Sequence, residues 1–401
     1  MKKKLLVGLL TSVMAIGLLS GCGNASKKDT KTLVLWTNMQ VEVETLQEIA
    51  TEWGDKEGYK VQVIHQSPSV QKFAQAVNSP DGPDGVLGIP NDQLADYVNA
   101  GMVAEVPSDL YKDEDYSSAA IQASYVDGKR YAVPLAVETI SLFYNTDKVK
   151  EAPKTWEELV KVAKELGGIQ FDATSIYYDL GFVRACGGYI FKYEAGKYDV
   201  RDIGLNNKGA REAYTFIDEL CKKYEYVSAD VTADIARSNF QNGNTAFYIG
   251  GPWDMDGFNN AGLNYKVAKM PTFKGNAFVT PVGTQIAFVS NVSENQEAVW
   301  KCFNYIAENG GERLFESGKR IPAKITEQQK KVVLQDENIQ ALVAQINDGE
   351  PMPTVSELGQ LWGIHMNNIR SMWGGEMNPQ ETADNIAKQL TEAVDLMNSG
   401  K

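Results

Sequence analysis

The sequence contains few of the residues on which most hydrolytic and metal chemistry depends. Its 401 residues include two histidines, His65 and His365, which lie far apart in the chain. Histidine is a common zinc ligand and the usual base beside a catalytic serine. We therefore expect no His-based zinc site, no Ser-His-Asp triad, and neither a metal nor a cofactor.

An excess of positive charge is also missing. The chain has 39 lysines and arginines against 52 aspartates and glutamates, so its formal net charge is −13. A phosphate backbone would be repelled by such a surface unless a local basic face reversed the sign. We expect no nucleic-acid partner.

Cysteine is scarce outside the N-terminal segment. Cys186, Cys221 and Cys302 are widely spaced and form no C-x-x-C motif. This spacing indicates neither a metal knuckle nor a redox pair. We expect free, buried thiols, although a disulfide between two of the three remains open.

Long apolar runs are absent except near the N-terminus. Three lysines precede the apolar residues 5–19, a run typical of a signal peptide and short for a membrane-spanning helix of about 20 residues. It ends in Leu19-Ser20-Gly21-Cys22, which resembles the lipobox of bacterial lipoproteins. We expect residues 1–21 to be removed, Cys22 to carry the lipid and residues 22–32 to form a tether; an uncleaved anchor helix is the alternative.

The rest of the chain has the composition of a globular α/β protein, and its length favours two domains. Residues 33–36 are apolar, apolar side chains recur at helical spacing from Val43 to Trp53, and residues 61–64 are extended. This strand-helix-strand order predicts a βαβ unit within a mainly parallel sheet covered by helices.

Several local motifs mark element boundaries. Thr155-Trp156-Glu157-Glu158 has the form of a helix capping box, and Asn206 or Asn207 precedes an apolar stripe over residues 210–221. Pro379 stands at the expected start of the last helix, and Asp127-Gly128 predicts a turn.

Aromatic residues beside glycines are the first binding candidates. Trp253 follows an apolar run and Gly250-Gly251-Pro252, which predicts a position at the carboxyl end of a strand, where α/β sheets bind ligands. Trp362 lies between Gly359 and Gly363, which disfavour a packed helix, and Tyr177-Tyr178 is a weaker aromatic pair. Such rings suit the apolar face of a pyranose, but core packing remains the alternative for each.

Two carboxylates complete the candidate site. Asp92 follows Pro90-Asn91, and Glu138 interrupts the apolar residues 132–144. A charge in such a stretch either faces a cleft or forms an ion pair between lobes. Carboxylates accept hydrogen bonds from sugar hydroxyls, but a glycosidase also uses two of them. A ligand-capturing receptor and a surface glycan hydrolase both fit.

Nine blocks of the sequence follow one another along the chain. They are Gly82-Pro83-Asp84, Asp92, Val133-Pro134-Leu135-Ala136-Val137-Glu138, Ser141-Leu142-Phe143-Tyr144-Asn145, Pro153-Lys154-Thr155-Trp156-Glu157-Glu158, Gly187-Gly188-Tyr189-Ile190-Phe191-Lys192-Tyr193, Gly196-Lys197-Tyr198-Asp199, Gly251-Pro252-Trp253 and Pro271-Thr272-Phe273-Lys274-Gly275. In these blocks and their order, the chain resembles the maltose/maltodextrin-binding proteins of bacterial ABC importers over nearly all of residues 33–401.

The resemblance implies an α/β, two-lobed periplasmic-binding-protein fold, each lobe a mainly parallel sheet flanked by helices, joined by a hinge. Residues 33–136 with 285–330 would form the N-terminal lobe, and residues 137–284 with 331–401 the C-terminal lobe. The chain would cross the hinge near Glu138, near residues 281–288 and around residues 325–335.

The resemblance also implies a function without catalysis. The protein would be a monomeric, lipid-anchored receptor on the extracellular face of the cytoplasmic membrane that captures maltodextrin and delivers it to an ABC permease. Another oligosaccharide is the nearest alternative, and a surface glycoside hydrolase a distant one.

Carried over by position, Asp92 and Glu138 correspond to hydroxyl-binding carboxylates on one lobe. Tyr177, Trp253 and Trp362 correspond to stacking aromatics on the other. The sequence departs from the family at several positions: Gly88-Ile89 replaces a tryptophan, Gln40-Val41 replaces an Asp-Lys pair, and Ser175 replaces an acidic contact. Tyrosines near Ala233 and Gly363 are also missing. With Gln40 and Ser175 as contacts, one wall of the site would be less aromatic than in the family.

Overall fold

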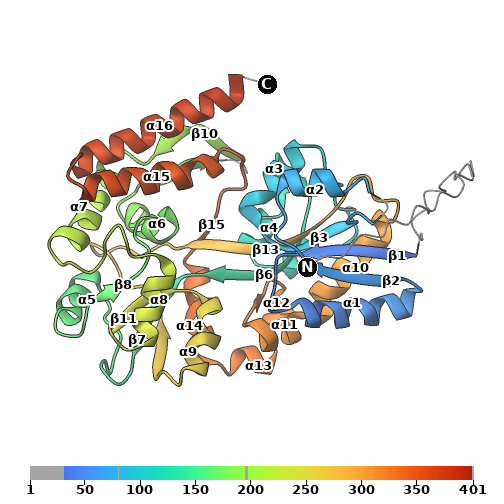
Figure 1. Cartoon of the computed structure of the whole chain (residues 1–401), viewed down its shortest axis with the longest axis horizontal. Helices are drawn as coiled ribbons and strands as arrows, with labels where there is room; N and C mark the ends of the chain where they lie inside the picture. The colour runs from blue at the N-terminus through green and yellow to red at the C-terminus, as the bar shows by residue number, and fades with distance from the viewer. Residues whose placement is uncertain (1–30, 80, 195–196, 400–401) are drawn as a thin grey trace, which may run out of the picture.

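The computed structural model describes residues 31–79, 81–194 and 197–399. The chain forms two α/β lobes side by side, with β6 and β13 running between them (Figure 1). We call the part around the seven-stranded sheet lobe I and the part around the four-stranded sheet lobe II. The predicted signal peptide, Cys22 and all of the tether except its last two residues lie outside the described residues.

Lobe I is built on a seven-stranded sheet of order β14-β6-β13-β3-β1-β2, with β15 paired to β13. Its strands are β1 (Thr32–Thr37), β2 (Lys60–His65), β3 (Gly85–Pro90), β6 (Val133–Thr139), β13 (Pro281–Val289), β14 (Ile321–Pro322) and β15 (Glu350–Pro351). Around it lie α1 (Val43–Glu57), α2 (Val70–Ala76), η1 (Asn91–Gln93), α3 (Leu94–Asn99), η2 (Asp113–Asp115), α4 (Ser118–Gln122), the β4 (Tyr125–Val126) and β5 (Lys129–Arg130) hairpin, α10 (Gln296–Asn309), α11 (Gly311–Gly318), α12 (Ile325–Gln328) and α13 (Lys331–Leu334).

Both faces of the lobe I sheet are buried. Leu33 and Leu35 of β1 belong to one hydrophobic cluster, whereas Val34 and Trp36 belong to another. Since neighbouring residues of a strand point to opposite faces, helices must cover both sides. This explains why residues 33–36 are continuously apolar rather than alternating.

Lobe II is built on a four-stranded sheet of order β12-β7-β11-β8. Its strands are β7 (Ser141–Asn145), β8 (Ile169–Gln170), β11 (Phe247–Gly250) and β12 (Tyr265–Ala268), with a separate hairpin of β9 (Tyr189–Glu194) and β10 (Lys197–Gly204). Its helices are α5 (Trp156–Ala163), α6 (Ile176–Ala185), α7 (Lys208–Lys222), α8 (Ala233–Gln241), η3 (Pro252–Asp254), α9 (Met255–Asn260), α14 (Glu337–Asn347), α15 (Leu358–Trp373) and α16 (Pro379–Ser399).

The sheets are mixed, which corrects the expectation that each would be mainly parallel. The first βαβ units are parallel as predicted, because β1 pairs in parallel with β2 and β3. However, β13 is antiparallel to both β3 and β6, and β7 is antiparallel to β11 and β12. A strand that returns from the other lobe enters the sheet from the opposite end, so it runs against the strands already there.

The chain passes between the two sheets more than once. It leaves the seven-stranded sheet at Ile140, between β6 and β7, and returns with β13 after β12. Later, α14 packs against β6 of lobe I and against β7 and β12 of lobe II. The lobe boundaries expected from the sequence stay a prediction.

The capping predictions are confirmed. The Thr155 hydroxyl accepts from the Glu158 N–H at 3.1 Å at the start of α5. Asn207, rather than Asn206, caps α7 by accepting from the Ala210 N–H at 2.8 Å. α16 begins at Pro379, as expected.

Two other expectations need correction or refinement. Gly359 and Gly363 do not interrupt a helix, because both lie within α15. The three cysteines of the described chain are free, as predicted, but only Cys302 is buried, and Cys186 and Cys221 are partly exposed.

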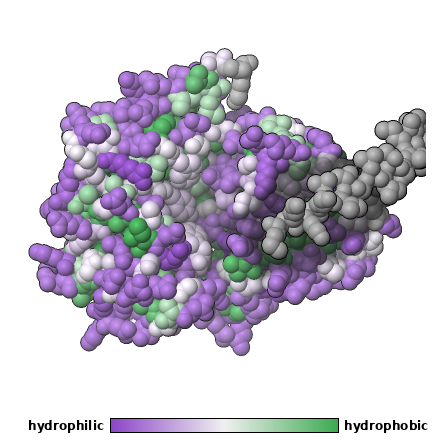
Figure 2. Space-filling view, in the orientation of Figure 1, coloured by the Kyte–Doolittle hydropathy of each residue, from purple (hydrophilic) through white to green (hydrophobic). Residues whose placement is uncertain are grey.

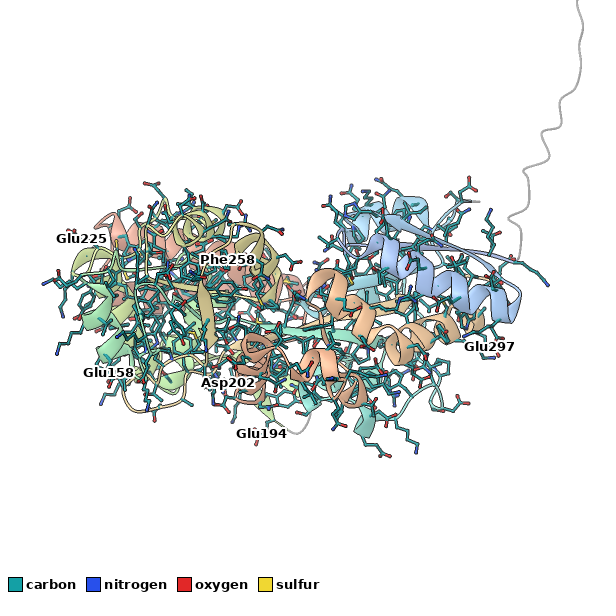
Figure 3. The ribbon with its side chains drawn as sticks, turned by 90° about the horizontal axis from the view of Figure 1, so that it is seen from below. Glu158, Glu194, Asp202, Glu225, Phe258 and Glu297 are labelled. Carbon is teal, nitrogen blue, oxygen red and sulfur yellow. The ribbon has the colours of Figure 1, made fainter. Side chains whose placement is uncertain are left out.

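The face of the molecule shown in Figure 2 is mostly hydrophilic, with apolar side chains in small scattered patches. Acidic side chains such as Glu158, Glu225 and Glu297 lie at the periphery, while Phe258 lies inside lobe II (Figure 3) and is fully buried. Within the part of the chain that the structure describes, no helix combines the length and apolar character needed to span a membrane.

Candidate functional site

A cavity of about 280 Å³ lies between the two lobes, close to the lower end of the range for ligand pockets. Lobe I and the chain segment after β15 contribute Pro90, Asn91, Asp92, Gln93, Glu138, Gly283 and Met352, and lobe II contributes Tyr177, Trp253 and Trp362. Five of the predicted site residues therefore surround one cavity. They bring two carboxylates to one side of it and three aromatic rings to the other.

Asp92 lies in η1, the short 3-10 turn that follows β3. The nearby backbone N–H groups of Asp92 and Gln93 favour the charged form of its carboxylate, and no ion pair to Asp92 occurs among the described residues. Burial raises the pKa of Asp92 to about 6, with smaller contributions from the charges of Asp96 and Glu138. Asp92 is thus a partly desolvated acceptor whose charge is not neutralised by a base.

Asn91, which the sequence did not suggest, fixes the turn that carries Asp92. Its side-chain amide donates to the Met352 carbonyl at 3.2 Å and to the Thr354 hydroxyl at 3.3 Å, and accepts from the Thr284 N–H at 3.0 Å. Because Asn91 is 1% exposed, these hydrogen bonds are shielded from water. The site turn is therefore tied to β13 and to the segment after β15.

Glu138 lies on β6, and both of its carboxylate oxygens are engaged. Gln285 Nε2 donates to Oε1 at 2.8 Å, and Arg320 Nη1 donates to Oε2 at 3.0 Å. Arg320 Nε also pairs with Glu42 Oε1 at 2.6 Å. Glu138 therefore both faces the cavity and forms an ion pair, although that pair lies within lobe I rather than between the lobes.

Trp253 lies directly after β11, at the carboxyl end of the strand, as predicted. Asp254 anchors the turn by accepting from the Tyr248 hydroxyl at 2.9 Å and from the Gly251 N–H at 3.3 Å. A Cβ on Gly251 would lie 2.3 Å from the Trp253 ring, so the close approach requires glycine here. With 38% of its surface exposed, Trp253 is not a core residue.

Tyr177 and Trp362 are presented by two helices that pack together. Tyr177 lies in the first turn of α6, and Trp362 lies in α15. Burial raises the pKa of the Tyr177 hydroxyl well above its usual range, with Glu138 and Tyr178 adding to it. Tyr178 does not line the cavity and is buried in the lobe II core.

His365 lies behind the site, in the interface of α6 and α15. Its Nδ1 is 3.1 Å from the Thr174 carbonyl oxygen, and its Nε2 is 3.7 Å from Asp179 Oδ2. Burial lowers the pKa of His365 to about 4 and raises that of Asp179. The imidazole is neutral at pH 7 and does not line the cavity.

Two predicted contacts, Gln40 and Ser175, are not among the residues that line the cavity. Gln40 is exposed in the turn after β1. Ser175 caps α6, where its hydroxyl accepts from the Tyr177 N–H at 3.4 Å. Both contacts were implied by the family resemblance alone.

The Gly88-Ile89 departure has a structural reason. Gly88 has φ +64°, and a Cβ there would lie 2.1 Å from the Met39 sulfur. Ile89 is 1% exposed and packs in the lobe I core. A large ring at either position would not fit without moving β3.

The residues missed from the sequence are Asn91, Gln93, Gly283, Met352 and, behind Glu138, Arg320. Gln93 could have been found, since it shares the turn of Asp92. As for metals, residues 31–79, 81–194 and 197–399 contain no group of three or more His, Cys, Asp or Glu side chains arranged to hold an ion.

Residues 36–313 match the model of a family described as bacterial extracellular solute-binding protein. A galactooligosaccharide-binding protein of Bacillus subtilis is 28% identical over the full length of both chains. A maltooligosaccharide ABC transporter solute-binding lipoprotein of Streptococcus pneumoniae is 27% identical over 80% of this chain and 78% of its own. The solved maltose-maltodextrin binding protein of Alicyclobacillus acidocaldarius superposes with a TM-score of 0.82 at 29% identity, covering 90% of this chain and 99% of that one.

Proposed function

The chain belongs to the bacterial extracellular solute-binding protein family, and we propose that it captures maltodextrin and delivers it to an ABC importer. The observation that carries this proposal is the cavity between the lobes, which has aromatic rings on one side and carboxylates on the other. A neutral sugar chain presents both complementary surfaces, apolar C–H faces and outward hydroxyls.

The aromatic side of the cavity would hold the sugar rings. Trp253 and Trp362 offer large flat surfaces, and Tyr177 adds a third ring. Stacking against such faces buries apolar area without requiring a charge on the ligand. This wall favours successive pyranose rings over a single small polar solute.

The carboxylate side would fix orientation. Asp92 and Glu138 accept hydrogen bonds from hydroxyl groups, and hydrogen bonds to a charged acceptor are stronger than neutral ones. With two acidic groups at the cavity and Arg320 outside its lining, an anionic ligand would be repelled. The site therefore supports an uncharged, hydroxyl-rich ligand.

A galactooligosaccharide is the second candidate. A relative that is 28% identical over the whole chain is named for that ligand. The same rings and carboxylates would serve either sugar, because stacking and hydroxyl binding are common to all pyranoses. The names of the maltooligosaccharide and maltodextrin relatives support the first candidate.

We further propose that the protein is a receptor and not an enzyme. Both Glu138 oxygens are engaged by Gln285 and Arg320, an arrangement that suits a fixed acceptor better than a nucleophile. The alternative, a surface glycoside hydrolase, would release reducing ends from starch fragments. Incubation of purified protein with maltoheptaose should therefore leave the number of reducing ends unchanged.

Anchoring and delivery complete the proposal. The motif at Cys22 and the lipoprotein name of the Streptococcus pneumoniae relative support lipid anchoring on the extracellular face of the cytoplasmic membrane, where we propose that the protein acts as a monomer. Its partners would be the permease subunits of an ABC transporter. The ligand would pass to them when the lobes open.

A calorimetric screen tests the proposed ligand. Maltose, maltotriose, maltoheptaose, cyclodextrin and a galactotriose are titrated into the soluble form lacking residues 1–22. Saturable binding of the maltooligosaccharides supports the first candidate, and preferential binding of galactotriose supports the second. Binding of none of these sugars would contradict the proposal.

A further inference from the structure

An arginine behind the cavity joins two glutamates in one continuous ion-pair chain. Arg320 Nε pairs with Glu42 Oε1 at 2.6 Å, and its Nη1 pairs with Glu138 Oε2 at 3.0 Å. Glu42 precedes α1, Arg320 precedes β14, and Glu138 lies on β6. Only Glu138 of the three lines the cavity.

Local structure places Arg320 opposite Glu138. α11 ends at Gly318, and Lys319 adopts a left-handed conformation with φ 54° that turns the chain into β14. β14 then pairs antiparallel with β6, with Ile321 opposite Val137 and Pro322 opposite Ala136. Continuing that register by one residue sets Arg320 across from Glu138 as a cross-strand ion pair.

Gly318, at the end of α11, makes room for the ion pair between Glu42 and Arg320. A Cβ on Gly318 would lie 2.0 Å from Glu42 Oε1. Glycine at this position therefore lets the Glu42 carboxylate approach the backbone and reach Arg320. The helix end and the two ion pairs form one local unit.

The three side chains are shielded from water to different degrees. Their exposed fractions are 1% for Glu42, 20% for Arg320 and 14% for Glu138. Burial alone would lower the pKa of Arg320, but Glu138 and Glu42 raise it overall, so the guanidinium stays charged. A buried carboxylate without its cation is strongly unfavourable, so each glutamate depends on Arg320.

We propose that Arg320 is a positioning residue of the ligand site, which acts through Glu138 without contacting the sugar. The inference rests on the proposed function and deepens it. A carboxylate has about four acceptor positions, of which Gln285 and Arg320 occupy one on each oxygen. These two contacts fix the orientation of the Glu138 carboxylate and leave its remaining acceptor positions for sugar hydroxyls. Less side-chain freedom of Glu138 is therefore lost on binding.

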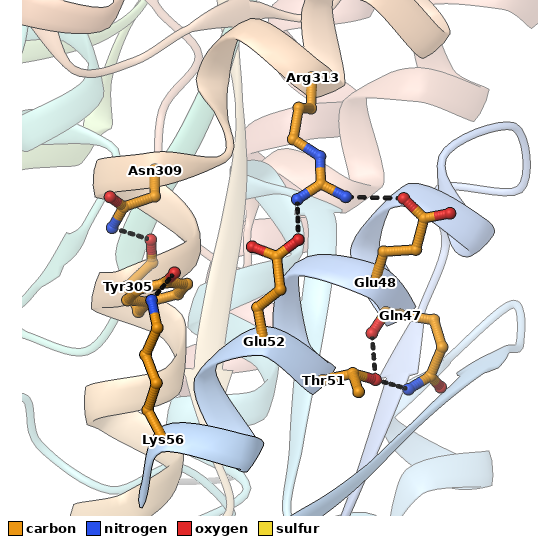
Figure 4. Close-up of polar contacts among 8 residues, drawn as sticks. All are labelled: Gln47, Glu48, Thr51, Glu52, Lys56, Tyr305, Asn309 and Arg313. Atoms are coloured by element: carbon orange, nitrogen blue, oxygen red, sulfur yellow. Dashed lines mark hydrogen bonds and ion pairs between the residues drawn. The ribbon is translucent and has the colours of Figure 1, made fainter.

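Arg313 provides a matched control. It lies on α11 and also bridges two glutamates, pairing with Glu52 Oε1 at 2.7 Å and Glu48 Oε2 at 2.6 Å (Figure 4). These glutamates lie on α1, and none of the three residues lines the cavity. Replacing Arg313 removes a double ion pair of the same composition, although a more exposed one, without touching Glu138.

The experiment compares maltotriose affinity by calorimetry with ligand-free melting temperature. We expect Arg320→Met to weaken maltotriose binding by roughly tenfold or more. Arg320→Lys should weaken it less, because lysine keeps the positive charge although it cannot reproduce the guanidinium fork. Arg313→Met should leave the affinity unchanged. Should Arg320→Met fail to fold, Glu42→Gln is added to remove the buried unpaired charge, and the comparison is made in that background.

A double-mutant cycle separates positioning from general stability. If Arg320 acts through Glu138, then Arg320→Met adds little further loss of affinity in a Glu138→Gln protein. Additive losses would overturn the proposal, as would an Arg320→Met protein that melts lower yet binds maltotriose like wild type. If wild-type protein binds no sugar of the screen, the proposed function and this inference both fail; if wild type binds and Arg320→Met binds equally, only the inference fails.

Discussion

At the scale of single residues, the two carboxylates of the cavity have opposite surroundings. Glu138 is held by Arg320 and Gln285, whereas no cation pairs with Asp92 among the described residues and burial raises its pKa to about 6. Burial without a cation makes the ionised form of Asp92 unfavourable in the ligand-free protein. The negative charge of Asp92 is therefore unfavourable in the ligand-free site, whereas that of Glu138 is stabilised by Arg320.

Asp92→Asn should make the effect of this unfavourable charge measurable. A folded pKa of about 6, against 3.8 as the usual value, means that the contribution of Asp92 to stability is present below pH 3.8 and is lost as the pH rises through 6. Relative to wild type, ligand-free Asp92→Asn should therefore gain stability between pH 4 and pH 8, by up to roughly 3 kcal/mol. Denaturant melts of both proteins at pH 4 and pH 8 measure the difference in stability. In a separate titration, the affinity of Asp92→Asn for maltotriose should be about tenfold lower than that of wild type. An equal stability difference at pH 4 and pH 8 would contradict the assignment.

Trp253→Ala should separate binding from packing. Because Trp253 is 38% exposed, its loss should change ligand-free melting little but reduce maltotriose affinity by roughly 30-fold, about 2 kcal/mol. Trp300→Phe is the control, since Trp300 is 2% exposed and should affect stability alone. A large drop in the ligand-free melting temperature of Trp253→Ala, with affinity retained, would indicate a core role.

Sequence reasoning found the two carboxylates and three aromatic rings of the cavity, but it missed other lining residues such as Asn91 and Met352 and the Arg320 side chain behind Glu138. Trp253 was recognisable from its glycines, and Glu138 from its charge in an apolar stretch. Arg320 was not, because its partner Glu138 is 182 positions away and the pairing depends on the register of β14. Residues that act through another side chain leave no local pattern in the sequence.

At the scale of elements, caps and apolar periodicity predicted the helices correctly, whereas the two glycines beside Trp362 were misleading. Thr155 and Asn207 cap their helices as expected, because an N-cap is a local hydrogen bond. Gly359 and Gly363 suggested a break, yet α15 continues through both. Its buried face, which includes Leu361, His365 and Ile369, outweighs the low helix propensity of glycine.

Alanine substitutions at two helical glycines, Gly363 and Gly181, should change stability in opposite directions. A Cβ on Gly363 would meet nothing within 4 Å, so Gly363→Ala should stabilise the protein by about 0.5–1 kcal/mol. In α6, a Cβ on Gly181 would lie 1.9 Å from the Phe278 ring, so Gly181→Ala should destabilise it by roughly 1–3 kcal/mol. Urea melts of both variants decide; a destabilised Gly363→Ala would show that the glycine is required.

At the scale of the whole molecule, the cavity exists only where the lobes meet. Its carboxylates come from lobe I and its rings from lobe II, so under the proposed function a sugar in the cavity would contact both lobes. The α/β class was evident from alternating strands and helices, and the two-lobed arrangement from the family resemblance. The antiparallel insertion of β13 was not, because its neighbours come from distant parts of the chain.

Ligand length should therefore matter for the whole molecule. Maltotriose can use Trp253 and Trp362 together, so it should bind more tightly than maltose. At 100 times the dissociation constant it should add about 2.7 kcal/mol to stability and raise the melting temperature accordingly. Calorimetry and melting curves measure both effects. If maltose bound as tightly as maltotriose or more tightly, the joint use of Trp253 and Trp362 would be contradicted.

Anchoring can be tested on the full chain. Cys22→Ala removes the thiol that would receive the lipid, so the variant should be released from membranes or remain unprocessed. Membrane fractionation and labelled palmitate measure the outcome in cells that carry the lipoprotein pathway. Equal labelling of wild type and variant would rule out Cys22 as the attachment site.

The central position of β13 also determines when the protein can fold. β13 lies between β3 and β6, pairing Ile286 with Ile89 on one side and with Pro134 on the other. A nascent chain that stops short of Pro281 leaves the edges of both strands unpaired in the middle of the sheet. The sheet of lobe I therefore cannot be completed until most of the polypeptide has been made. Contacts so distant in sequence also form slowly.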